Sequence, residues 1–384
     1  MVGAGPQAWP QAPGTSRSAL SGLGSVSACP SITTPQIVIE QIELTRYEDT
    51  GKLGSGADYE VRSAIDRETG LQVVLKRPMP QMITRQMHGS TEARTDLVLR
   101  LHQAMNQRVP GLVPILGYTE RANHDEFFGD ALGQEYRVTV EERASGIPLY
   151  VGDPRARIIG VPVGAAQNLF ALFPLASGDY DATHPIHRQL LDVQESFLEL
   201  GYILFDLGPQ NVFYQPGIGK ITVIDCGALV DRNSEPDARR RPAKDIHDFY
   251  LEILKFYTTS SPPPTEADGY RDGYGLRPVV NFGEELDEMA RRYELAGELE
   301  PVNGPCRDSA LVLINNVRQR AYTGLDGFRQ DLMEHLDAVA ERNSKLPEFE
   351  QSRRAWNEAL GWFREDYWRR FLFDPDTELA GFNS

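Results

Sequence analysis

The spacing of hydrophobic residues changes once along this chain, after about residue 180, and the change limits the folds that it can adopt. Between Arg46 and Arg77, apolar and polar residues alternate around the turn "DRETG", which is typical of a β-hairpin. From Ile186 onward, apolar residues recur every three or four positions over several long segments, which indicates amphipathic helices. The sequence therefore predicts an α+β protein whose strands come first and whose helices come second.

Further elements are expected in both parts. In the first part, the spacing predicts a helix over 91–105 with an apolar stripe formed by Ala93, Leu97, Leu101 and Met105. Strands are expected at 111–118 and 168–173, separated by an inserted hairpin or flap at about 121–167. In the second part, helices are expected at 186–200, 246–257, 284–295, 309–322, 325–342 and 350–371.

The expected regions follow from these patterns and from composition. Residues 1–40 are rich in Gly, Ser, Pro and Ala, which predicts a disordered N-terminal extension. The remaining chain is expected to form a β-rich region over 41–173 and a helical region over 174–384, with helices at its end that could carry a partner protein.

Charge and cysteine content exclude several classes of protein. A net charge of -16 argues against nucleic acid as the main partner, although "RRRPAK" at 239–244 is basic. No run of about 18 apolar residues occurs, so we expect no membrane insertion. The three cysteines lie far apart, which predicts neither a disulfide framework nor a zinc site and fits a cytoplasmic protein.

Two short patterns in the first part could bind phosphate. In "KLGSGADYEV", Gly54 and Gly56 would let backbone N–H groups approach phosphate oxygens, although such glycines also form ordinary tight turns. Lys76 lies in the apolar strand "VVLKR", where its ammonium would point over a cleft or into solvent. Glu92, in the first turn of the next helix, could pair with Lys76 or simply favour the helix start, and Asp96 is a rival partner.

Two loops in the second part carry oxygen ligands. "LFDLGPQN" places Asp206 and Asn211 five residues apart, and "VIDCG" places Asp225 at the end of an apolar strand. Carboxylate and amide oxygens suit Mg²⁺, and a carboxylate can also accept a hydroxyl proton. Asp and Asn are equally common in ordinary turns, which is the alternative interpretation.

In order and spacing, "LGSGADYEV", "VVLK", Glu92, "DLGPQN" and "VIDCG" resemble the signature set of eukaryotic-type protein kinases. "KDIHDFYLEIL" from Lys244 is similar to the buried helix that supports the kinase catalytic loop. The resemblance covers about residues 47–257. It implies a two-lobed protein kinase-like fold, with a β-rich N-lobe and an α-helical C-lobe.

The resemblance also implies a role for each residue. Lys76 would contact ATP phosphates, Asp206 would deprotonate the acceptor hydroxyl, and Asn211 and Asp225 would hold Mg²⁺. The other residues implied in nucleotide binding are Gly54, Gly56, Val61, Glu92 and the hinge at 173–176, including Phe173 and Leu175. Asp245 would anchor the catalytic loop from below.

Several positions depart from the kinase pattern. Tyr59 replaces the third glycine, the pair Leu204–Phe205 replaces the usual His-Arg, Gly208 replaces a lysine, and Cys226, which we expect to be a buried inert thiol, replaces a phenylalanine. Twenty positions separate Asp225 from Asp245, which is too short for the usual activation segment.

We therefore expect an atypical kinase that transfers the γ-phosphoryl group of ATP to a hydroxyl with Mg²⁺, most simply to Ser or Thr of a protein. One alternative is a small-molecule kinase of the aminoglycoside or choline kinase type, which the short segment after Asp225 fits. The other is a nucleotide-binding pseudokinase that acts as a scaffold, which the lost His-Arg pair would allow.

Overall fold

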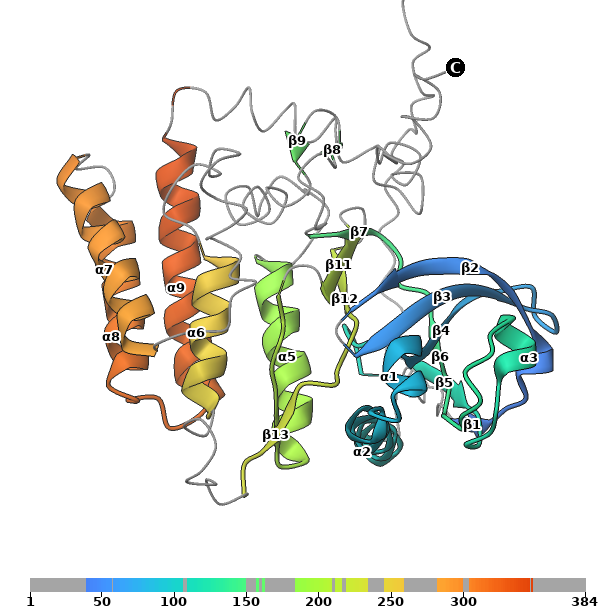
Figure 1. Cartoon of the computed structure of the whole chain (residues 1–384). Helices are drawn as coiled ribbons and strands as arrows, with labels where there is room; N and C mark the ends of the chain where they lie inside the picture. Colours follow the sequence, from blue (N-terminus) through green and yellow to red (C-terminus); the bar gives the residue numbers. More distant parts are fainter. Residues whose placement is uncertain are drawn as a thin grey trace, which may run out of the picture. The chain divides into compact units, whose positions relative to one another are not determined.

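The structure, a computed structural model, is mixed α+β (Figure 1). It describes residues 39–149 except 57 and 106–108, 157–158, 161–162, 184–233 except 209–210 and 216–218, 245–258, 282–299, 304–345 and 347. The predictions for 1–38, for the strand at 168–173 and for the helix at 350–371 lie outside these residues. Within the described residues, no helix is both long and apolar enough to cross a membrane.

A six-stranded sheet dominates the first part of the chain. Its strand order is β1-β5-β6-β4-β3-β2, and neighbouring strands are antiparallel except for the parallel pair β1–β5. The strands are β1 (Glu40–Gln41), β2 (Tyr47–Ser55), β3 (Tyr59–Asp66), β4 (Gln72–Pro78), β5 (Ile115–Tyr118) and β6 (Thr139–Glu142).

The hairpin β3–β4 confirms the prediction made from alternating residues. Asp66 fixes its turn, because its carboxylate accepts hydrogen bonds from the Glu68 N–H (3.0 Å) and the Thr69 hydroxyl (2.9 Å). The Arg46 guanidinium donates to the same carboxylate and holds the pKa of Asp66 well below its usual range. The turn closes at Gly70, whose φ of 71° favours glycine.

The position of strand β6 shows that part of the range 121–167, which was expected to form an inserted hairpin or flap, belongs to the main sheet. Thr139–Glu142 lies inside the sheet, between β4 and β5, and Lys76 pairs with Thr139. The alternation of "RVTVE" is an ordinary strand pattern, but the glycines before and after it suggested a separate flap. The sheet therefore continues to Glu142.

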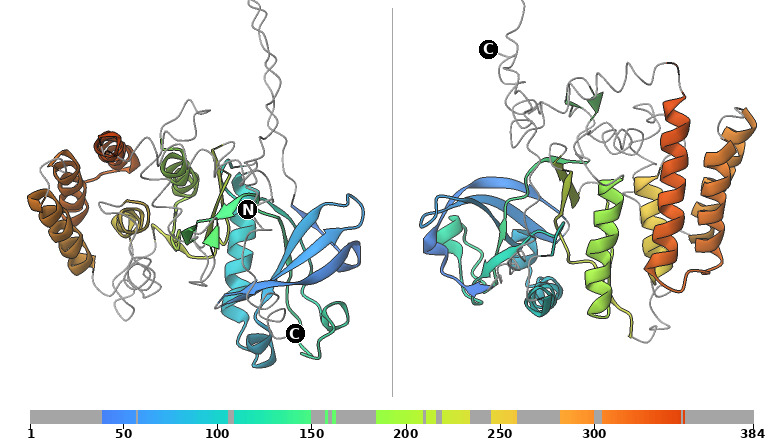
Figure 2. Two further views of the ribbon diagram at one scale, coloured as in Figure 1. Left: turned by 90° about the horizontal axis from the view of Figure 1, so that it is seen from above. Right: turned by 180° about the vertical axis from the view of Figure 1, so that it is seen from behind.

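The two faces of the sheet have different surroundings. One face packs into a core with Leu75, Tyr136 and Val140, to which the short helices η1 (Leu44–Arg46), α1 (Pro80–Thr84) and α3 (Asp125–Phe128) contribute. The opposite face carries Lys76 and meets α2 (Gly89–Met105), which lies along it (Figure 2).

Helix α2 exists as predicted, and most of its expected apolar stripe contacts the core. Leu101 is buried and Leu97 and Met105 pack against the core, whereas Ala93 is exposed. The buried positions nearer the start of the helix are Thr91, Glu92, Thr95 and Leu99. Since these positions include polar side chains, apolar spacing alone could not reveal which face contacts the sheet.

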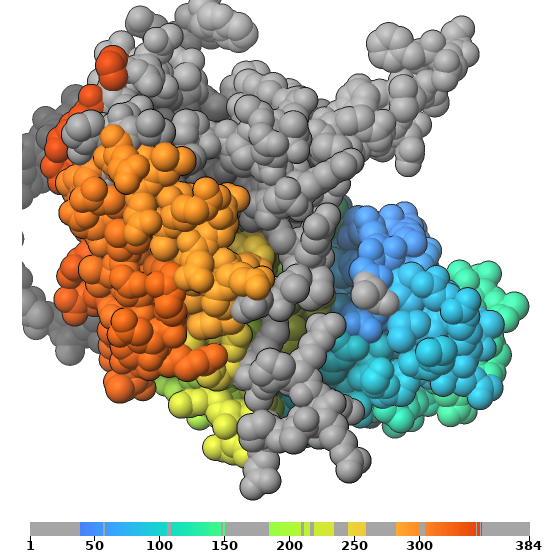
Figure 3. All heavy atoms as spheres, turned by 60° about the vertical axis from the view of Figure 1, so that its left-hand side comes forward, coloured from blue at the N-terminus to red at the C-terminus, as the bar shows by residue number. Residues whose placement is uncertain are grey.

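The second part of the chain is built on helices at the predicted places. Apolar residues of these helices share one core, in which the rings of Tyr250 and Phe328 stack 4.1 Å apart. Helix α8 packs against α7 and α9 (Figures 1 and 2), and α7 and α8 share an outer surface drawn in orange (Figure 3). The helices are α5 (Pro185–Glu199), α6 (Ile246–Tyr257), α7 (Phe282–Leu299), α8 (Gly304–Arg318) and α9 (Leu325–Ser344).

Three small sheets complete the described residues. Strand β10 (Tyr202–Leu204) pairs with β13 (Leu229–Asp231), and β8 (Arg157–Ile158) pairs with β9 (Val161–Pro162). The third sheet has the order β12-β11-β7 and consists of β7 (Ile147–Pro148), β11 (Val212–Gln215) and β12 (Lys220–Val223).

Gly146 is required where the chain runs from β6 to β7. Its φ is 92°, and a Cβ atom there would lie 2.4 Å from the Tyr214 carbonyl oxygen. Gly146→Ala is therefore expected to lower the free energy of unfolding by about 3 kcal/mol, because backbone strain adds to a clash with main-chain atoms. Urea unfolding measures the change.

Gly129→Ala is the matched control for this substitution. Gly129 also has a positive φ, 68°, but no atom lies within 4 Å of the added Cβ. The control should cost only about 1 kcal/mol, the cost of the left-handed conformation alone. Equal losses in the two variants would show that the close contact at Tyr214 is unimportant.

Candidate functional site

Two loops that carry the predicted residues lie side by side because the same strand pairs hold them. Residues 205–211 connect β10 to β11, and residues 224–228 connect β12 to β13. Since β10 pairs with β13 and β11 pairs with β12, both ends of one loop lie next to the ends of the other. Two backbone hydrogen bonds join them, from Phe205 N to Ala228 O (2.8 Å) and from Ile224 N to Asn211 O (2.8 Å).

Asp206 has an exposed side chain on a constrained backbone. Its φ is 61°, an uncommon conformation that Asp tolerates better than most residues. The Asp206 N–H donates to the carboxylate of Glu252, a buried residue of α6, over 3.0 Å. Tyr257, also of α6, donates its hydroxyl to the Leu207 carbonyl. Helix α6 therefore fixes the direction in which Asp206 points.

Asn211 is oriented by the same loop. Its side-chain Nδ2 donates to the Asp206 carbonyl oxygen over 2.9 Å, and its own carbonyl oxygen accepts from Ile224 N. The first contact uses the amide nitrogen, so the amide oxygen is turned away from it. Asn211 thus leaves its amide oxygen out of this hydrogen bond, while its main chain is bonded to the segment that carries Asp225.

Asp225 forms an ion pair with Lys76, although 149 positions separate them in the sequence. The Lys76 Nζ lies 2.8 Å from Asp225 Oδ1; the lysine side chain is 11% exposed and the carboxylate 40% exposed. Asp225 also has a positive φ, 60°. Strain of this kind is found most often at binding and catalytic sites. The carboxylate is therefore open to solvent on one side and paired on the other.

The sheet aligns three of the predicted residues in one row. Gly54 pairs with Val61, Val61 pairs with Lys76, and Lys76 pairs with Thr139. A Cβ atom added at Gly54 or at Gly56 would meet nothing within 4 Å, and neither glycine has a positive φ. Neither close packing nor a strained backbone requires glycine at these two positions. The space beside them is therefore open to a ligand.

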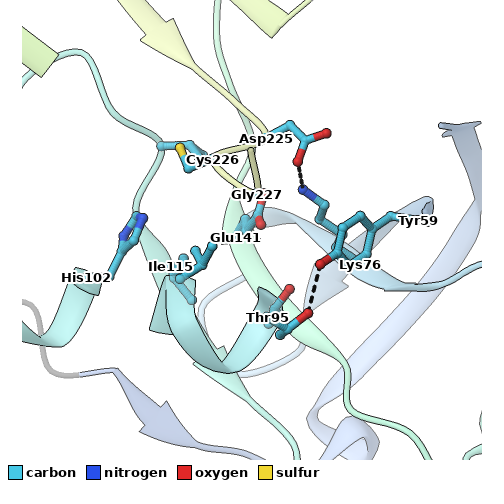
Figure 4. A pocket seen from close by; sticks show the side chains of 12 residues that line it. Tyr59, Lys76, Thr95, His102, Ile115, Glu141, Asp225, Cys226 and Gly227 are labelled. Atoms are coloured by element: carbon cyan, nitrogen blue, oxygen red, sulfur yellow. Dashed lines mark hydrogen bonds and ion pairs between the residues drawn. The ribbon is translucent and has the colours of Figure 1, made fainter. Parts of the chain in front are cut away.

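A pocket lies on the α2 side of the Lys76–Asp225 pair (Figure 4). It encloses about 390 Å³, including its open mouth, and apolar and polar side chains line it. The lining residues are Tyr59, Lys76, Thr95, Val98, His102, Val113, Ile115, Thr139, Glu141, Asp225, Cys226 and Gly227.

The pocket keeps Lys76 charged. Burial disfavours the ammonium, but the nearby carboxylates of Glu141 and Asp225 outweigh this effect, so the pKa of Lys76 is raised. Burial raises the pKa of Glu141, and Lys76 opposes that shift. The pKa of the Cys226 thiol is also raised by burial, which agrees with the prediction of an inert thiol. Lysine and two carboxylates therefore share one partly enclosed space.

The predicted pairing of Glu92 with Lys76 is wrong. Glu92 is 3% exposed, its Oε1 accepts from the Arg137 N–H (2.8 Å), and its Oε2 pairs with Arg121 (2.6 Å). Its rival Asp96 pairs with the same two arginines. Both carboxylates lie on the side of α2 that faces these arginines, and Thr95, not a carboxylate, lines the pocket beside Lys76. The arginines are distant from α2 in the sequence, so their pairing could not be predicted.

Asp245 does not contact the loop of Asp206 through any of its described hydrogen bonds. Its carboxylate accepts from the His247 N–H at the start of α6, forming a capping box with Asp248, and also pairs with Arg320. Glu252 and Tyr257, which lie further along α6, make the loop contacts instead. The prediction identified the supporting helix but chose the wrong residue of it.

Other predicted features have simpler outcomes. Leu204 and Phe205 are buried in the core shared by the helices, so an apolar pair fills the space before Asp206. Phe173 and Leu175 lie outside the described residues, so the predicted hinge is not described. Sequence reasoning missed Glu141 and Glu252, whose strand and helix patterns carry no signal that distinguishes them from exposed glutamates.

The oxygen atoms of the two loops suit a divalent cation. Asn211 supplies an amide oxygen and Asp225 a half-exposed carboxylate, and hard oxygen ligands are those that Mg²⁺ prefers. Among the described residues, no group of three or more His, Cys, Asp or Glu side chains could by itself hold a metal ion. A cation here would therefore need further oxygens, such as those of phosphates.

Comparison of the sequence with protein-family models and with curated proteins finds no match in either set.

Proposed function

We propose that this protein is an atypical protein kinase-like phosphotransferase, with two lobes, that moves the γ-phosphoryl group of ATP to a hydroxyl. One observation carries the proposal: Lys76 pairs with Asp225, and the loop of Asp206 and Asn211 is hydrogen-bonded to the segment of Asp225. Four residues singled out by their spacing in the sequence, Lys76, Asp206, Asn211 and Asp225, thus lie on neighbouring segments of separate elements, which an accidental set of turns would not explain.

Each residue has a role in this proposal. Lys76 would bind the phosphates, the backbone at Gly54 and Gly56 would approach them, and Asp206 would accept the proton of the acceptor hydroxyl. Asn211 and Asp225 would hold Mg²⁺, which would neutralise charge on the phosphates. The fixed backbone around Asp206 supports a catalytic role, because catalysis of this kind depends on positioning. We propose Ser or Thr of a protein as the acceptor.

A nucleotide-binding scaffold is the second candidate. It is favoured by the engagement of Glu92 and Asp96 with arginines, which leaves Lys76 without a carboxylate from α2. In that case the protein would bind ATP without transferring its phosphoryl group.

Asp206→Asn separates the two candidates. Asparagine tolerates the positive φ at this position, and the side chain is exposed, so the fold should be retained. The rate of transfer from γ-labelled ATP to a protein or small hydroxyl acceptor is expected to fall about 100-fold or more, since proton acceptance is lost. Asp308→Asn, on the exposed surface of α8, is the matched control and should leave the rate unchanged.

Thermal unfolding with ATP and Mg²⁺ completes the experiment. A ligand that binds only the folded state raises the melting temperature, so both wild type and Asp206→Asn should gain stability. Stabilisation without transfer by the wild type would identify a scaffold. If neither stabilisation nor transfer is found, the proposed function is wrong.

A further inference from the structure

Tyr59 lies between Lys76 and α2 and contacts both. The Lys76 Nζ is 4.5 Å from the centroid of the Tyr59 ring, within the range of a cation–π interaction. The Tyr59 hydroxyl lies 2.9 Å from Thr95 Oγ1 and 3.2 Å from the Thr91 carbonyl oxygen, both on α2 (Figure 4 shows the Tyr59–Thr95 bond). One side chain therefore joins the strand lysine to the helix.

The contact of Tyr59 with α2 is a compact hydrogen-bonded cluster. Thr95 Oγ1 also donates to the Thr91 carbonyl oxygen over 3.0 Å, so three oxygens lie within 3.2 Å of one another. Thr91 and Thr95 are both buried. Buried hydroxyls that satisfy one another in this way resist separation, because a parted group would lose its partner without gaining water.

No carboxylate of α2 takes the place of Tyr59 as the link between the helix and Lys76. Glu92 and Asp96 pair with Arg121 and Arg137 on another side of the helix. The α2 residues that contact Tyr59 are the neutral Thr91 and Thr95. The negative charge that faces Lys76 comes instead from Asp225 and from Glu141 of the sheet.

We propose that Tyr59 is a positioning residue that couples α2 to Lys76 and sets the direction of the lysine ammonium. The catalytic meaning of this inference rests on the proposed function. When Asp225 binds a cation, Lys76 would remain in contact with the Tyr59 ring, which would hold the ammonium in place while it binds phosphate. Movement of α2 is then transmitted to the phosphate-binding group through an aromatic ring, not through an ion pair.

Two conservative substitutions test the link from its two ends. Thr95→Val keeps the shape of the helix residue and removes its hydroxyl, and Tyr59→Phe keeps the ring and removes its hydroxyl. Each substitution should raise the rate at which an N-hydroxysuccinimide ester acylates Lys76 by about threefold to tenfold. Peptide mass spectrometry at fixed pH measures this rate. The double variant should react no faster than either single variant, because both changes break one link.

Tyr136→Phe is the matched control. Tyr136 is buried on the opposite face of the same sheet, where its hydroxyl lies 3.1 Å from Arg77 Nη1. The substitution also removes one hydroxyl that contacts a partner, but it should change neither the acylation rate of Lys76 nor kcat/KM for ATP. In Thr95→Val and Tyr59→Phe, kcat/KM for ATP should fall about threefold to tenfold.

The outcomes distinguish this inference from the proposed function. Unchanged acylation of Lys76 in Thr95→Val, or effects that add in the double variant, would overturn the role of Tyr59 even if the enzyme transfers phosphate. Failure of the wild type to bind or use ATP would overturn the proposed function. The acylation rates would still decide whether Tyr59 couples α2 to Lys76.

Discussion

Asp225→Asn is expected to lower the rate of γ-phosphoryl transfer by about 1,000-fold, the largest effect of any single substitution that we propose. Asparagine tolerates the positive φ of Asp225 and can still accept a hydrogen bond from Lys76, so the geometry of the pair should survive. The substitution removes the negative charge that would hold Mg²⁺, and with it the neutralisation of phosphate charge. Initial rates measured over a range of Mg²⁺ concentrations report the effect.

Stability provides the control for this prediction. Because the Asp225 side chain is 40% exposed, the ion pair should contribute no more than about 1 kcal/mol to folding. The variant should therefore unfold at nearly the wild-type urea concentration while it loses ATP-dependent stabilisation, which Asp206→Asn should keep. Transfer within tenfold of the wild-type rate would contradict the assignment of Asp225 as a metal ligand.

Arg77→Met is expected to lower the free energy of unfolding by about 3 kcal/mol. Arg77 is 2% exposed, and its guanidinium donates to Glu60 (2.7 Å), to Asp130 (2.5 Å) and to the Tyr136 hydroxyl (3.1 Å). Its guanidinium also lies 4.0 Å from the centroid of the Phe128 ring. Methionine fills similar space but leaves the buried Glu60 carboxylate without its main partner. Urea unfolding at pH 7 measures the loss.

The pH dependence of this loss identifies its cause. Burial acts to raise the pKa of Glu60, but Arg77 reverses the effect and the pKa is lowered below its usual 4.5. A carboxyl with a lowered folded-state pKa contributes stability above its unfolded value and loses it as pH falls through the folded-state value. The difference between wild type and Arg77→Met should therefore shrink below about pH 4.5.

Arg67→Met is the control for Arg77→Met. Arg67 is an exposed residue in the turn between β3 and β4, so its replacement should change stability by no more than about 0.5 kcal/mol. A loss in Arg77→Met that stays constant from pH 7 to pH 4 would show that packing, not the pairing of Glu60, causes it.

The sequence predicted those elements whose burial follows apolar spacing. The hairpin β3–β4 and helix α5 have the expected bounds to within a few residues, and the α5 positions Ile186, Leu190, Val193 and Phe197 are all buried. Strand β6 was missed because a short alternating segment between glycines gives no sign of its neighbours. Strand pairing depends on contacts between residues far apart in the sequence.

The candidate site was predictable as a set of residues but not in its pairings. Lys76 and Asp225, which the kinase resemblance assigns to one site, form an ion pair that the sequence did not predict, whereas Glu92 pairs with Arg121 and Arg137. The α2 residues that contact Tyr59 of the sheet are Thr91 and Thr95, whose burial no hydrophobic pattern indicates. The contact of Glu252 with Asp206 depends equally on long-range packing, since 46 positions separate the two residues.

The ion pair between Lys76 and Asp225 has a thermodynamic consequence for ligand binding. A cation that binds Asp225 must compete with the ammonium, and a phosphate that binds Lys76 must compete with the carboxylate. Either ligand alone therefore disrupts the pair and leaves one charged side chain without its partner. Together they exchange partners, so each should strengthen binding of the other by the same factor. The resting protein would then discriminate against free cation and free nucleotide in favour of their complex.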